Sequence, residues 1–290
     1  MTLILGIDEA GRGPIIGPMV MCGLLVDEKG EKKLEAMGAK DSKMLTREQR
    51  EGLFDRIKKI AIAYKIVVIE PSEIDRAVGR EDGLNLNRLE ARKSCLIIDE
   101  LKPDKAYIDS PSNNVKKYKE YLRSHLKDKS VELVVEHKAD VKFKSVSGAS
   151  ILAKVTRDNE IDGLKKNIGM DLGSGYMTDP KTIEFMKANY EKHADIFRKS
   201  WFPYKELVNK KMQRSLEDFT SFIREEPAKS PVLERMKKLE DFGYHFAVPK
   251  SEHELAIMKG PCTIILYKSG KLLIQGKEDV KKSVEKLLKE

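Results

Sequence analysis

Acidic residues stand at three places in the sequence where a buried strand is expected to end. Asp8 and Glu9 directly follow the apolar stretch TLILGI near the amino terminus, and Asp109 ends the segment KAYID. Asp140 follows the segment VELVVEH and opens a predicted helix. In open α/β sheets, sites form at the carboxyl ends of the strands. Acids that end neighbouring parallel strands would therefore meet in one crevice.

Four carboxylates in one crevice point to divalent metal ions. They raise one another's pKa values by repulsion unless a cation neutralises them. Oxygen ligands without His or Cys select Mg²⁺ or Mn²⁺ rather than zinc, and two such ions about 3.5–4 Å apart suit in-line displacement at phosphorus. In the structural alternative, Asp8 and Asp109 belong to turns and Asp140 caps a helix. Spacing alone favours this alternative for Asp140 and the metal site for Asp8 and Glu9.

The elements that must position these acids form a series of strands and helices. Three closely joined strands come first and later strands alternate with helices, which predicts an α/β layered domain whose later strands run parallel to the first. The predicted elements are strands over 2–8, 15–27, 61–70, 105–110 and 131–137, a helix over 46–60 with Thr46 and Gln49 as a capping box, and helices over 84–101, 114–127 and about 140–167.

Two local features bear on the geometry of the acids. Consecutive residues on a regular strand face opposite ways, so the strand must break if Asp8 and Glu9 serve one site, and the following AGRG supplies the break. The helix after Asp140 is rich in small residues, which let it lie close to the sheet and bring Asp140 over the strand ends. These small residues are Ser145, Ser147, Gly148, Ala149, Ser150 and Ala153.

Composition narrows the class of protein. Of the 290 residues 40% are hydrophobic, so wholesale disorder is excluded. The chain has no apolar run of the roughly 20 residues that cross a membrane and no signal peptide at its amino terminus, which predicts a soluble cytoplasmic protein. Cys22, Cys95 and Cys262 lie in apolar surroundings and predict buried thiols rather than disulfides or a zinc site. The net charge of +8 fits a polyanionic partner and a lysine-rich solvated surface equally.

A change of composition at REEPAKSP, residues 224–231, marks a predicted domain boundary. It separates a large domain over residues 1–225 from a small α+β domain over 231–290. In the small domain two apolar runs predict a hairpin with Gly270 at its turn, and a helix ends the chain. About 60 residues are few for independent stability, so this domain is expected to dock on the larger one or on a ligand.

The segment DEAGRGPIIGP, residues 8–18, resembles the signature of type 2 ribonuclease H, the ribonuclease HII family. Further blocks of that family follow in its order and spacing, and the resemblance covers roughly residues 1–205, in the style of archaeal members. These blocks are KDSKMLT (40–46), GLNLNRLEA (83–91), AYIDS (106–110), EHKADVKFKSVSGASILAKVTRD (136–158) and GSGYMTDP (173–180).

The resemblance implies a fold and a metal site. The fold is ribonuclease H-like, with a mixed five-stranded sheet flanked by helices. The family's four metal-binding carboxylates are matched by Asp8, Glu9, Asp109 and Asp140. This match reverses the preference that spacing alone gave for Asp140.

The resemblance also implies how a ribonucleotide is recognised. Gly11, Arg12 and Gly13 match the GRG segment, whose backbone contacts the 2′-hydroxyl of the ribonucleotide. Glycines allow main-chain amides to approach a sugar closely, and the 2′-OH is the group that distinguishes RNA from DNA. Tyr176 matches the tyrosine that stacks on the deoxyribose after the ribonucleotide, which selects a junction of RNA followed by DNA.

Three polar residues extend the predicted binding surface. Lys43 and Arg47 lie one turn apart near a helix start and are candidate phosphate contacts, although solvation alone would also explain exposed cations. Asn87 matches a polar position near the scissile phosphate. Lys154 and Arg157 are interpreted as structural or backbone-steering residues.

The carboxyl-terminal extension departs from the common pattern of the family. Residues 259–290 resemble part of the TATA-binding-protein-like substrate domain of ribonuclease HIII, which lies at the opposite end of that protein. Residues 250–290 hold nine Lys against six acids, a net charge of +3, which fits phosphate contacts and a solvated helix equally.

The resulting prediction is a monomeric endoribonuclease with two Mg²⁺ or Mn²⁺ ions per site. It acts on RNA:DNA hybrids and on ribonucleotides embedded in duplex DNA, as in ribonucleotide excision during repair and replication, and leaves 3′-OH and 5′-phosphate ends. One ion, on Asp8 and Asp140, activates the water, and the other, on Asp8, Glu9 and Asp109, stabilises the leaving oxygen. Two alternatives stay open: a hybrid-binding protein that has lost catalysis, and another nuclease of the ribonuclease H superfold.

Overall fold

The computed structural model describes residues 2–38, 45–80, 83–211, 213 and 231–289. The chain divides into two compact units, residues 1–205 and 206–290. Each unit has its own sheet and its own apolar core. The predicted boundary at residues 224–231 falls almost entirely outside the described residues, so its position stays a prediction.

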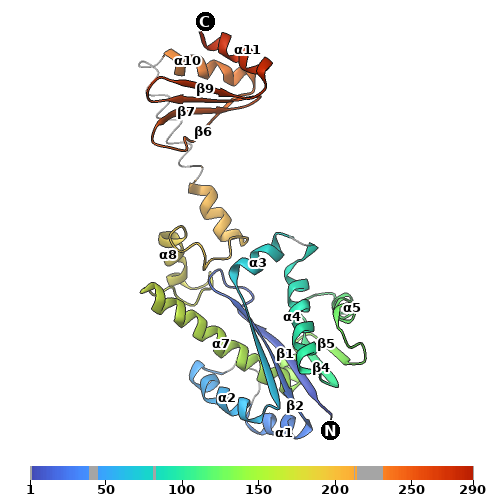
Figure 1. The fold of residues 1–290 in the computed structure, drawn as a ribbon. Coiled ribbons are helices and arrows are strands. Elements are labelled where there is room, and N and C mark those ends of the chain that lie inside the picture. The colour runs from blue at the N-terminus through green and yellow to red at the C-terminus, as the bar shows by residue number, and fades with distance from the viewer. Residues whose placement is uncertain (1, 39–44, 81–82, 212, 214–230, 290) are drawn as a thin grey trace. The chain divides into compact units, whose positions relative to one another are not determined.

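The first unit is built on a five-stranded sheet in the order β3-β2-β1-β4-β5 (Figure 1). The strands are β1 (Ile4–Ala10), β2 (Met19–Val26), β3 (Ala63–Ile69), β4 (Lys105–Asp109) and β5 (Glu132–Glu136). β1, β4 and β5 run parallel, whereas β2 pairs antiparallel with both β1 and β3. The prediction of a mixed five-stranded sheet is confirmed.

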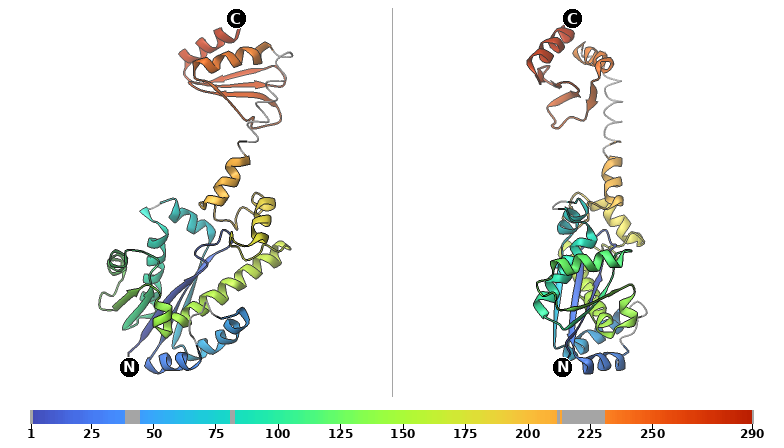
Figure 2. Two further views of the ribbon diagram at one scale, coloured as in Figure 1. Left: turned by 180° about the vertical axis from the view of Figure 1, so that it is seen from behind. Right: turned by 90° about the vertical axis from the view of Figure 1, so that its right-hand side faces the viewer.

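Helices cover both faces of this sheet (Figure 2). They are α1 (Glu28–Ala36), α2 (Arg47–Ile60), α3 (Pro71–Val78), α4 (Leu86–Leu101), α5 (Val115–His125), α6 (Ala139–Lys142), α7 (Lys144–Ile168) and α8 (Pro180–Asn189), and residues 202–211 are also helical. The alternation of side chains along β1 separates two cores. Leu5 and Ile7 pack with α4 and α5, whereas Ile4 and Ala10 pack with α2 and α7.

The ends of the helices follow local signals where those signals are strong. The Thr46 hydroxyl accepts from the Gln49 N–H, and the Gln49 side chain accepts from the Thr46 N–H, so the predicted capping box of α2 is confirmed.

The helices α1 and α3 were not predicted. In α1 only Gly30 and Leu34 are buried, and one large apolar side chain gives no helical periodicity.

The long helix α7 lies against β1 with almost no space between the two backbones. A Cβ added at Gly6 would come within 2.1 Å of the Ser145 carbonyl carbon, so only glycine permits this approach. The prediction of one helix from about residue 140 is wrong, because α6 and α7 are separated at Phe143. This residue has extended backbone (φ −114°, ψ 127°), and its ring stacks on Tyr107 with centroids 3.8 Å apart.

The second unit has an antiparallel sheet in the order β6-β7-β8-β9. Its elements are α10 (Pro231–Lys238), a 3-10 helix (Leu239–Phe242), β6 (His245–Ala247), β7 (Glu254–Lys259), β8 (Thr263–Tyr267), β9 (Leu272–Gln275) and α11 (Glu278–Lys289). Gly270 has φ +81° in the hairpin turn between β8 and β9, as predicted.

Two expectations about the whole chain can be compared with the described residues. The three cysteines are free thiols and all are buried, which confirms the prediction. Among the helices that the structure describes, none combines the length and the apolar character needed to cross a bilayer.

Candidate active site

The four predicted metal ligands lie at the carboxyl end of the parallel strands. Asp8 and Glu9 occupy the last part of β1, Asp109 is the last residue of β4, and Asp140 lies in α6 just after β5. The pairing of β1 with β4 ends at Ile7, whereas its pairing with β2 continues to Ala10. The edge of β1 that faces β4 therefore opens beside the acids.

Asp8 and Glu9 lie on opposite faces of the sheet. The strand does end in AGRG, at Ala10, as predicted, but β1 runs through both acids, so the expectation that the break brings them to one face is wrong. Asp8 faces α7, where the Ser150 hydroxyl hydrogen-bonds to it, and Glu9 lies on the α4 side, where its charge interacts with Glu90. Both carboxyl groups nevertheless lie within electrostatic reach of Asp109.

Burial and mutual repulsion disfavour the charged forms of these carboxyl groups. Asp8 is 7% exposed, and burial first of all, with Asp109 and Asp140 adding to it, raises the pKa of Asp8 to about 7. Burial and the neighbouring Asp8 hold the pKa of Glu9 well above its usual range. Buried oxygen donors with raised pKa values fit a divalent cation, because such an ion would stabilise their charged forms.

The side chains are not arranged around a common point. Among the residues that the structure describes, no three Asp, Glu, His or Cys side chains converge as metal ligands do. One oxygen of Asp109 accepts a hydrogen bond of 2.8 Å from the Ala139 N–H, which ties the end of β4 to the start of α6. Metal binding by the four acids therefore requires some of their side chains to rotate.

A tight turn follows β1 and lines a pocket beside Glu9. We call Gly11–Gly13 the GRG turn; Gly11 has φ +76°, a left-handed conformation that favours glycine. The pocket has a volume of about 460 Å³, and Tyr176 lies on it, with a ring carbon 3.9 Å from the Cβ position of Gly13. The structure thus brings the GRG turn, Tyr176 and one of the predicted metal ligands to a single pocket.

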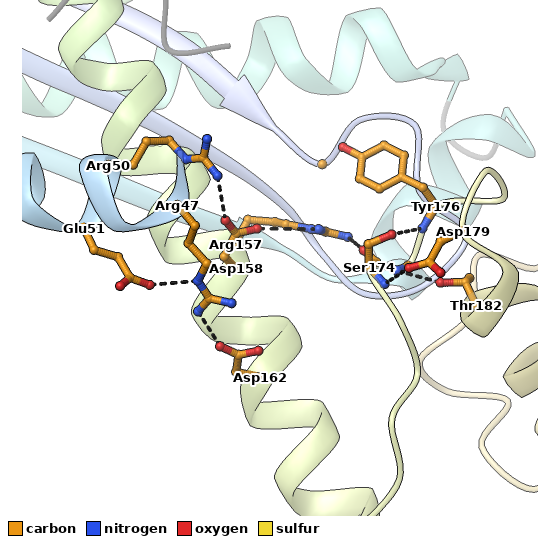
Figure 3. A network of polar contacts seen from close by, with 12 residues as sticks. Arg47, Arg50, Glu51, Arg157, Asp158, Asp162, Ser174, Tyr176, Asp179 and Thr182 are labelled. Carbon is orange, nitrogen blue, oxygen red and sulfur yellow. Dashed lines mark hydrogen bonds and ion pairs between the residues drawn. The ribbon is translucent and has the colours of Figure 1, made fainter. Parts of the chain in front are cut away.

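Arg157, which lines the pocket, is hydrogen-bonded to the Tyr176 loop (Figure 3). Its guanidinium donates to the Ser174 carbonyl at 2.7 Å and lies 5.2 Å from the centre of the Tyr176 ring. The N–H groups of Ile15 and Ile16, just after the GRG turn, donate to the Gly175 carbonyl. The GRG turn and the Tyr176 loop are therefore held together by side-chain and main-chain contacts.

The Arg12 side chain is held by two residues of α4. Its guanidinium donates to Glu90 at 2.8 Å and to Asn87 at 2.7 Å. Glu90 is 1% exposed, and burial raises its pKa to about 7 despite the nearby Arg12 charge. Sequence reasoning had not singled out Glu90. The sequence did hold a signal for it, because Glu90 lies one helical turn after Leu86, on the otherwise apolar face of the helix.

Of the two predicted phosphate contacts near the start of α2, only Arg47 lies among the described residues. Arg47 pairs with Glu51 at 2.8 Å and with Asp162 at 2.5 Å (Figure 3). It also lines a separate pocket of about 320 Å³. These two carboxylates already neutralise its charge, and a phosphate would have to compete with them. Lys43 lies outside the described residues. Both phosphate contacts stay predictions.

Two further residues that contact the GRG turn were missed. Arg198 is fully buried, and burial, with repulsion from Arg157, lowers its pKa to about 10. Its guanidinium bonds to carbonyls of the GRG turn, as does the indole N–H of Trp201. The only local signal was a cation and an aromatic residue in the short segment RKSW, about 185 residues from the turn.

Comparisons with known proteins give a consistent result. The family model described as ribonuclease HII matches residues 5–203. The chain is 43% identical to ribonuclease HII of Pyrococcus furiosus over 223 residues, which cover 74% of this chain and 96% of that protein. It is also similar to the crystal structure of ribonuclease H2 from Pyrococcus horikoshii, with 39% identity, a TM-score of 0.65 and coverage of 72% and 98%.

A more distant structure has the same fold. It is Bst-RNase HIII in complex with Mn²⁺, which is 23% identical, with a TM-score of 0.60 and coverage of 72% of this chain and 70% of that one. At this identity the likeness concerns the fold alone.

Proposed function

The chain belongs to the ribonuclease HII family and is a ribonuclease H, and on this premise we propose that it incises nucleic acid on the 5′ side of a ribonucleotide. The substrates are ribonucleotides embedded in duplex DNA and the RNA strand of RNA:DNA hybrids. Water adds to phosphorus as the bond to the upstream 3′ oxygen breaks, which leaves a 3′-OH and a 5′-phosphate.

One observation carries this proposal. Glu9, near the end of β1, lines a pocket together with the GRG turn and Tyr176, and Asp109 ends the neighbouring strand β4. A phosphodiester beside the acids would place the sugar next to backbone amides and an aromatic ring. Such a site could distinguish a ribose from a deoxyribose, because amides and a ring can recognise a 2′-OH and the sugar that follows it. A nuclease for plain DNA has no need of this combination.

The metal site we propose consists of the four carboxylates. Asp8, Glu9, Asp109 and Asp140 would hold two Mg²⁺ or Mn²⁺ ions, whose chemistry is to lower the pKa of water and to stabilise the leaving oxygen. Asp8 is buried, Glu9 is partly buried and lines the pocket, and the hydrogen bond from the Ala139 N–H orients Asp109.

The remaining roles belong to the chain's own binding groups. Glu90 and Asn87 fix Arg12, and this fixes the direction of the chain through the GRG turn. Tyr176, backed by the Arg157 guanidinium, presents its ring to the sugar after the ribonucleotide. Asn87 is in this view both a support of Arg12 and a polar group near the scissile phosphate.

We assign residues 231–290 a supporting role in substrate binding. Their net positive charge suits the phosphate backbone of a duplex, and the hairpin between β8 and β9 exposes two lysines. The first unit, in contrast, holds every residue that we assign to the chemistry.

The test uses the full chain and three duplexes of one sequence in Mg²⁺ or Mn²⁺. One duplex carries a single ribonucleotide, the second is all DNA, and the third is an RNA:DNA hybrid. Incision of the first on the 5′ side of the ribonucleotide, with no incision of the second, is expected. Tight binding without incision would instead indicate a hybrid-binding protein, and equal incision of the all-DNA duplex would indicate another nuclease of the superfold.

A further inference from the structure

Arg198 is fully buried, and its guanidinium bonds to main-chain carbonyls. It donates to the Gly11 carbonyl at 2.6 Å and to the Arg12 carbonyl at 2.7 Å. Two further bonds, of 3.1 and 3.0 Å, reach the Gly17 carbonyl. A buried charge needs hydrogen-bond partners, and here the partners are three carbonyls of the connection between β1 and β2, two of them in the GRG turn. Arg198 is thus built into the turn that follows β1.

Trp201 completes this set of contacts. Its indole N–H donates to the Gly13 carbonyl at 3.2 Å, and its ring lies 5.2 Å from the Arg198 guanidinium carbon. The three successive carbonyls of the GRG turn are therefore all bound by one short segment, residues 198–201. We call Arg198 and Trp201 together the carbonyl clamp.

The direction of the carbonyls decides the direction of the amides. A trans peptide is planar, and its N–H points opposite to its C=O. Because the Gly11 and Arg12 carbonyls face Arg198, the N–H groups of Arg12 and Gly13 face away from it. Arg12 and Gly13 both line the pocket, whereas Arg198 does not. Within the described part of the chain neither N–H is used in a hydrogen bond. Two free donors side by side suit a hydroxyl oxygen.

The clamp is itself anchored to the first unit. The N–H groups of Lys199 and Ser200 each donate to the Asp75 carboxylate at 2.8 Å, and the Ser200 hydroxyl adds a third bond. The Arg198 N–H donates to the Ile15 carbonyl at 2.9 Å, just beyond the GRG turn. Residues 198–200 are therefore fixed by Asp75 of α3 and by the Ile15 carbonyl.

We propose that Arg198 and Trp201 are positioning residues that set the selectivity for a 2′-OH. Neither residue lines the pocket, so each acts through the GRG turn and is not a catalytic residue. By holding the carbonyls on the inner side, the clamp presents the two amides to the ribose. This inference rests on the proposed function, because it concerns how the same pocket recognises its substrate.

The experiment compares three variants of the full chain on duplexes with one modified nucleotide. Arg198→Lys keeps the charge but cannot bridge three carbonyls, and Trp201→Phe keeps a ring but removes the indole N–H. Lys199→Arg is the matched control, because only the main chain of Lys199 holds Asp75. The duplexes carry either a ribonucleotide or a 2′-deoxy-2′-fluoro nucleotide, whose fluorine accepts hydrogen bonds poorly.

We expect Arg198→Lys to lower kcat on the ribonucleotide about 100-fold, the size of effect that a displacement of about 1 Å can have. KM should change less than about threefold, because phosphate contacts lie elsewhere. Trp201→Phe should lower kcat about fivefold. In both variants the preference for the ribonucleotide over the fluorinated nucleotide should shrink, whereas Lys199→Arg should behave as the wild type.

Two outcomes would overturn the inference. One is wild-type kcat and selectivity in both clamp variants. The other is a loss of activity with unchanged selectivity and a lower unfolding temperature, which would show a merely structural role. Wild-type protein that fails to incise the ribonucleotide duplex would overturn the proposed function instead, so the two failures can be told apart.

Discussion

The two units of the chain differ in what they bury. Among the described residues of the first unit, five charged side chains are almost inaccessible to solvent: Asp8, Glu90, Asp140, Arg157 and Arg198. In the described part of the second unit the buried side chains are apolar or weakly polar. Its one buried side-chain hydrogen bond in the described range joins the Tyr244 hydroxyl to the Cys262 sulfur, 3.3 Å apart.

This difference supports the proposal that the chemistry lies in the first unit. Burying a charge costs free energy unless it is paired or hydrogen-bonded, so a core built for stability alone avoids it. Clusters of buried groups with shifted pKa values therefore point to function. The first unit keeps such a cluster at the ends of β1 and β4, whereas the second unit has a core typical of a small packed domain. The predictions below test this contrast.

The largest effect is expected from Asp8→Asn. Loss of a carboxylate ligand should lower incision by on the order of 1000-fold or more, since metal ions contribute several kcal/mol to the transition state. Metal-free protein should unfold at a higher temperature, because the substitution removes a buried charge. The exposed Asp241 of the second unit is the control, and Asp241→Asn should change neither property. Normal incision by Asp8→Asn, measured by gel assay, would contradict the metal assignment.

The next prediction concerns metal and pH. Asp8 has a pKa of about 7 in the folded state against 3.8 for an unperturbed carboxyl group, so the folded protein binds the proton more tightly. Stability of the metal-free protein should therefore fall as pH rises from about 4 to about 7. Above pH 7, bound Mg²⁺ or Mn²⁺ should restore part of this stability. The free energy of unfolding should rise by about 2.7 kcal/mol when the ion concentration is 100-fold above its Kd.

Thermal unfolding with EDTA or with excess metal, at pH 5.5 and pH 8, measures this effect. A gain of some degrees is expected at pH 8 and a smaller one at pH 5.5, where Asp8 is largely protonated. In Asp8→Asn the gain should be reduced at both pH values. An equal gain at the two pH values in the wild type would show that these carboxylates are not the metal ligands.

The positions of the acids could be predicted from sequence because the signals are local. Each acid follows an apolar run, and the order of strands and helices places the ends of β1 and β4 side by side. The faces of Asp8 and Glu9 also follow from alternation along β1, once the strand is known to continue to Ala10.

The contacts that shape the site could not be predicted, because they join distant segments. Arg47 is held by Asp162, 115 residues away, and Arg12 by Glu90, 78 residues away. Arg198 reaches the GRG turn from the far end of the first unit. No periodicity links such pairs, since they depend on how the sheet brings loops together. The break at Phe143 was missed for the same reason, because the ring of Tyr107 on β4 stacks on it.

Two exposed aromatic residues allow the units to be compared directly. Tyr176 is 39% exposed beside the pocket, and Phe242 is 62% exposed in the second unit. Tyr176→Ala should lower the preference for an RNA-to-DNA junction about tenfold, in keeping with the roughly 1–3 kcal/mol of one aromatic stacking contact. Phe242→Ala should leave the preference unchanged. The measurement is kcat/KM on a junction duplex and on a duplex with consecutive ribonucleotides. An equal effect of the two substitutions would contradict the role of Tyr176.

The smallest effect is expected from the lysines of the second unit's hairpin. Lys268 and Lys271 flank the turn at Gly270, and both are exposed. If they contact phosphates, Lys268→Glu with Lys271→Glu should reduce the slope of log K against log salt by about 0.9 for each lost contact. Because neither residue belongs to the site in the first unit, kcat at saturating substrate should not change.

Binding of a ribonucleotide duplex at several salt concentrations, with Asp8→Asn as background to prevent incision, measures the slope. The exposed Lys102 of the first unit, just after α4, offers a control as Lys102→Glu. A lower slope with unchanged kcat would show that the second unit contributes affinity and the first unit contributes chemistry. An unchanged slope would remove the second unit from substrate binding, since surface lysines that contact a duplex must release counterions. The first unit would then carry out both the chemistry and the substrate binding, and the apolar core of the second unit would only stabilise its own fold.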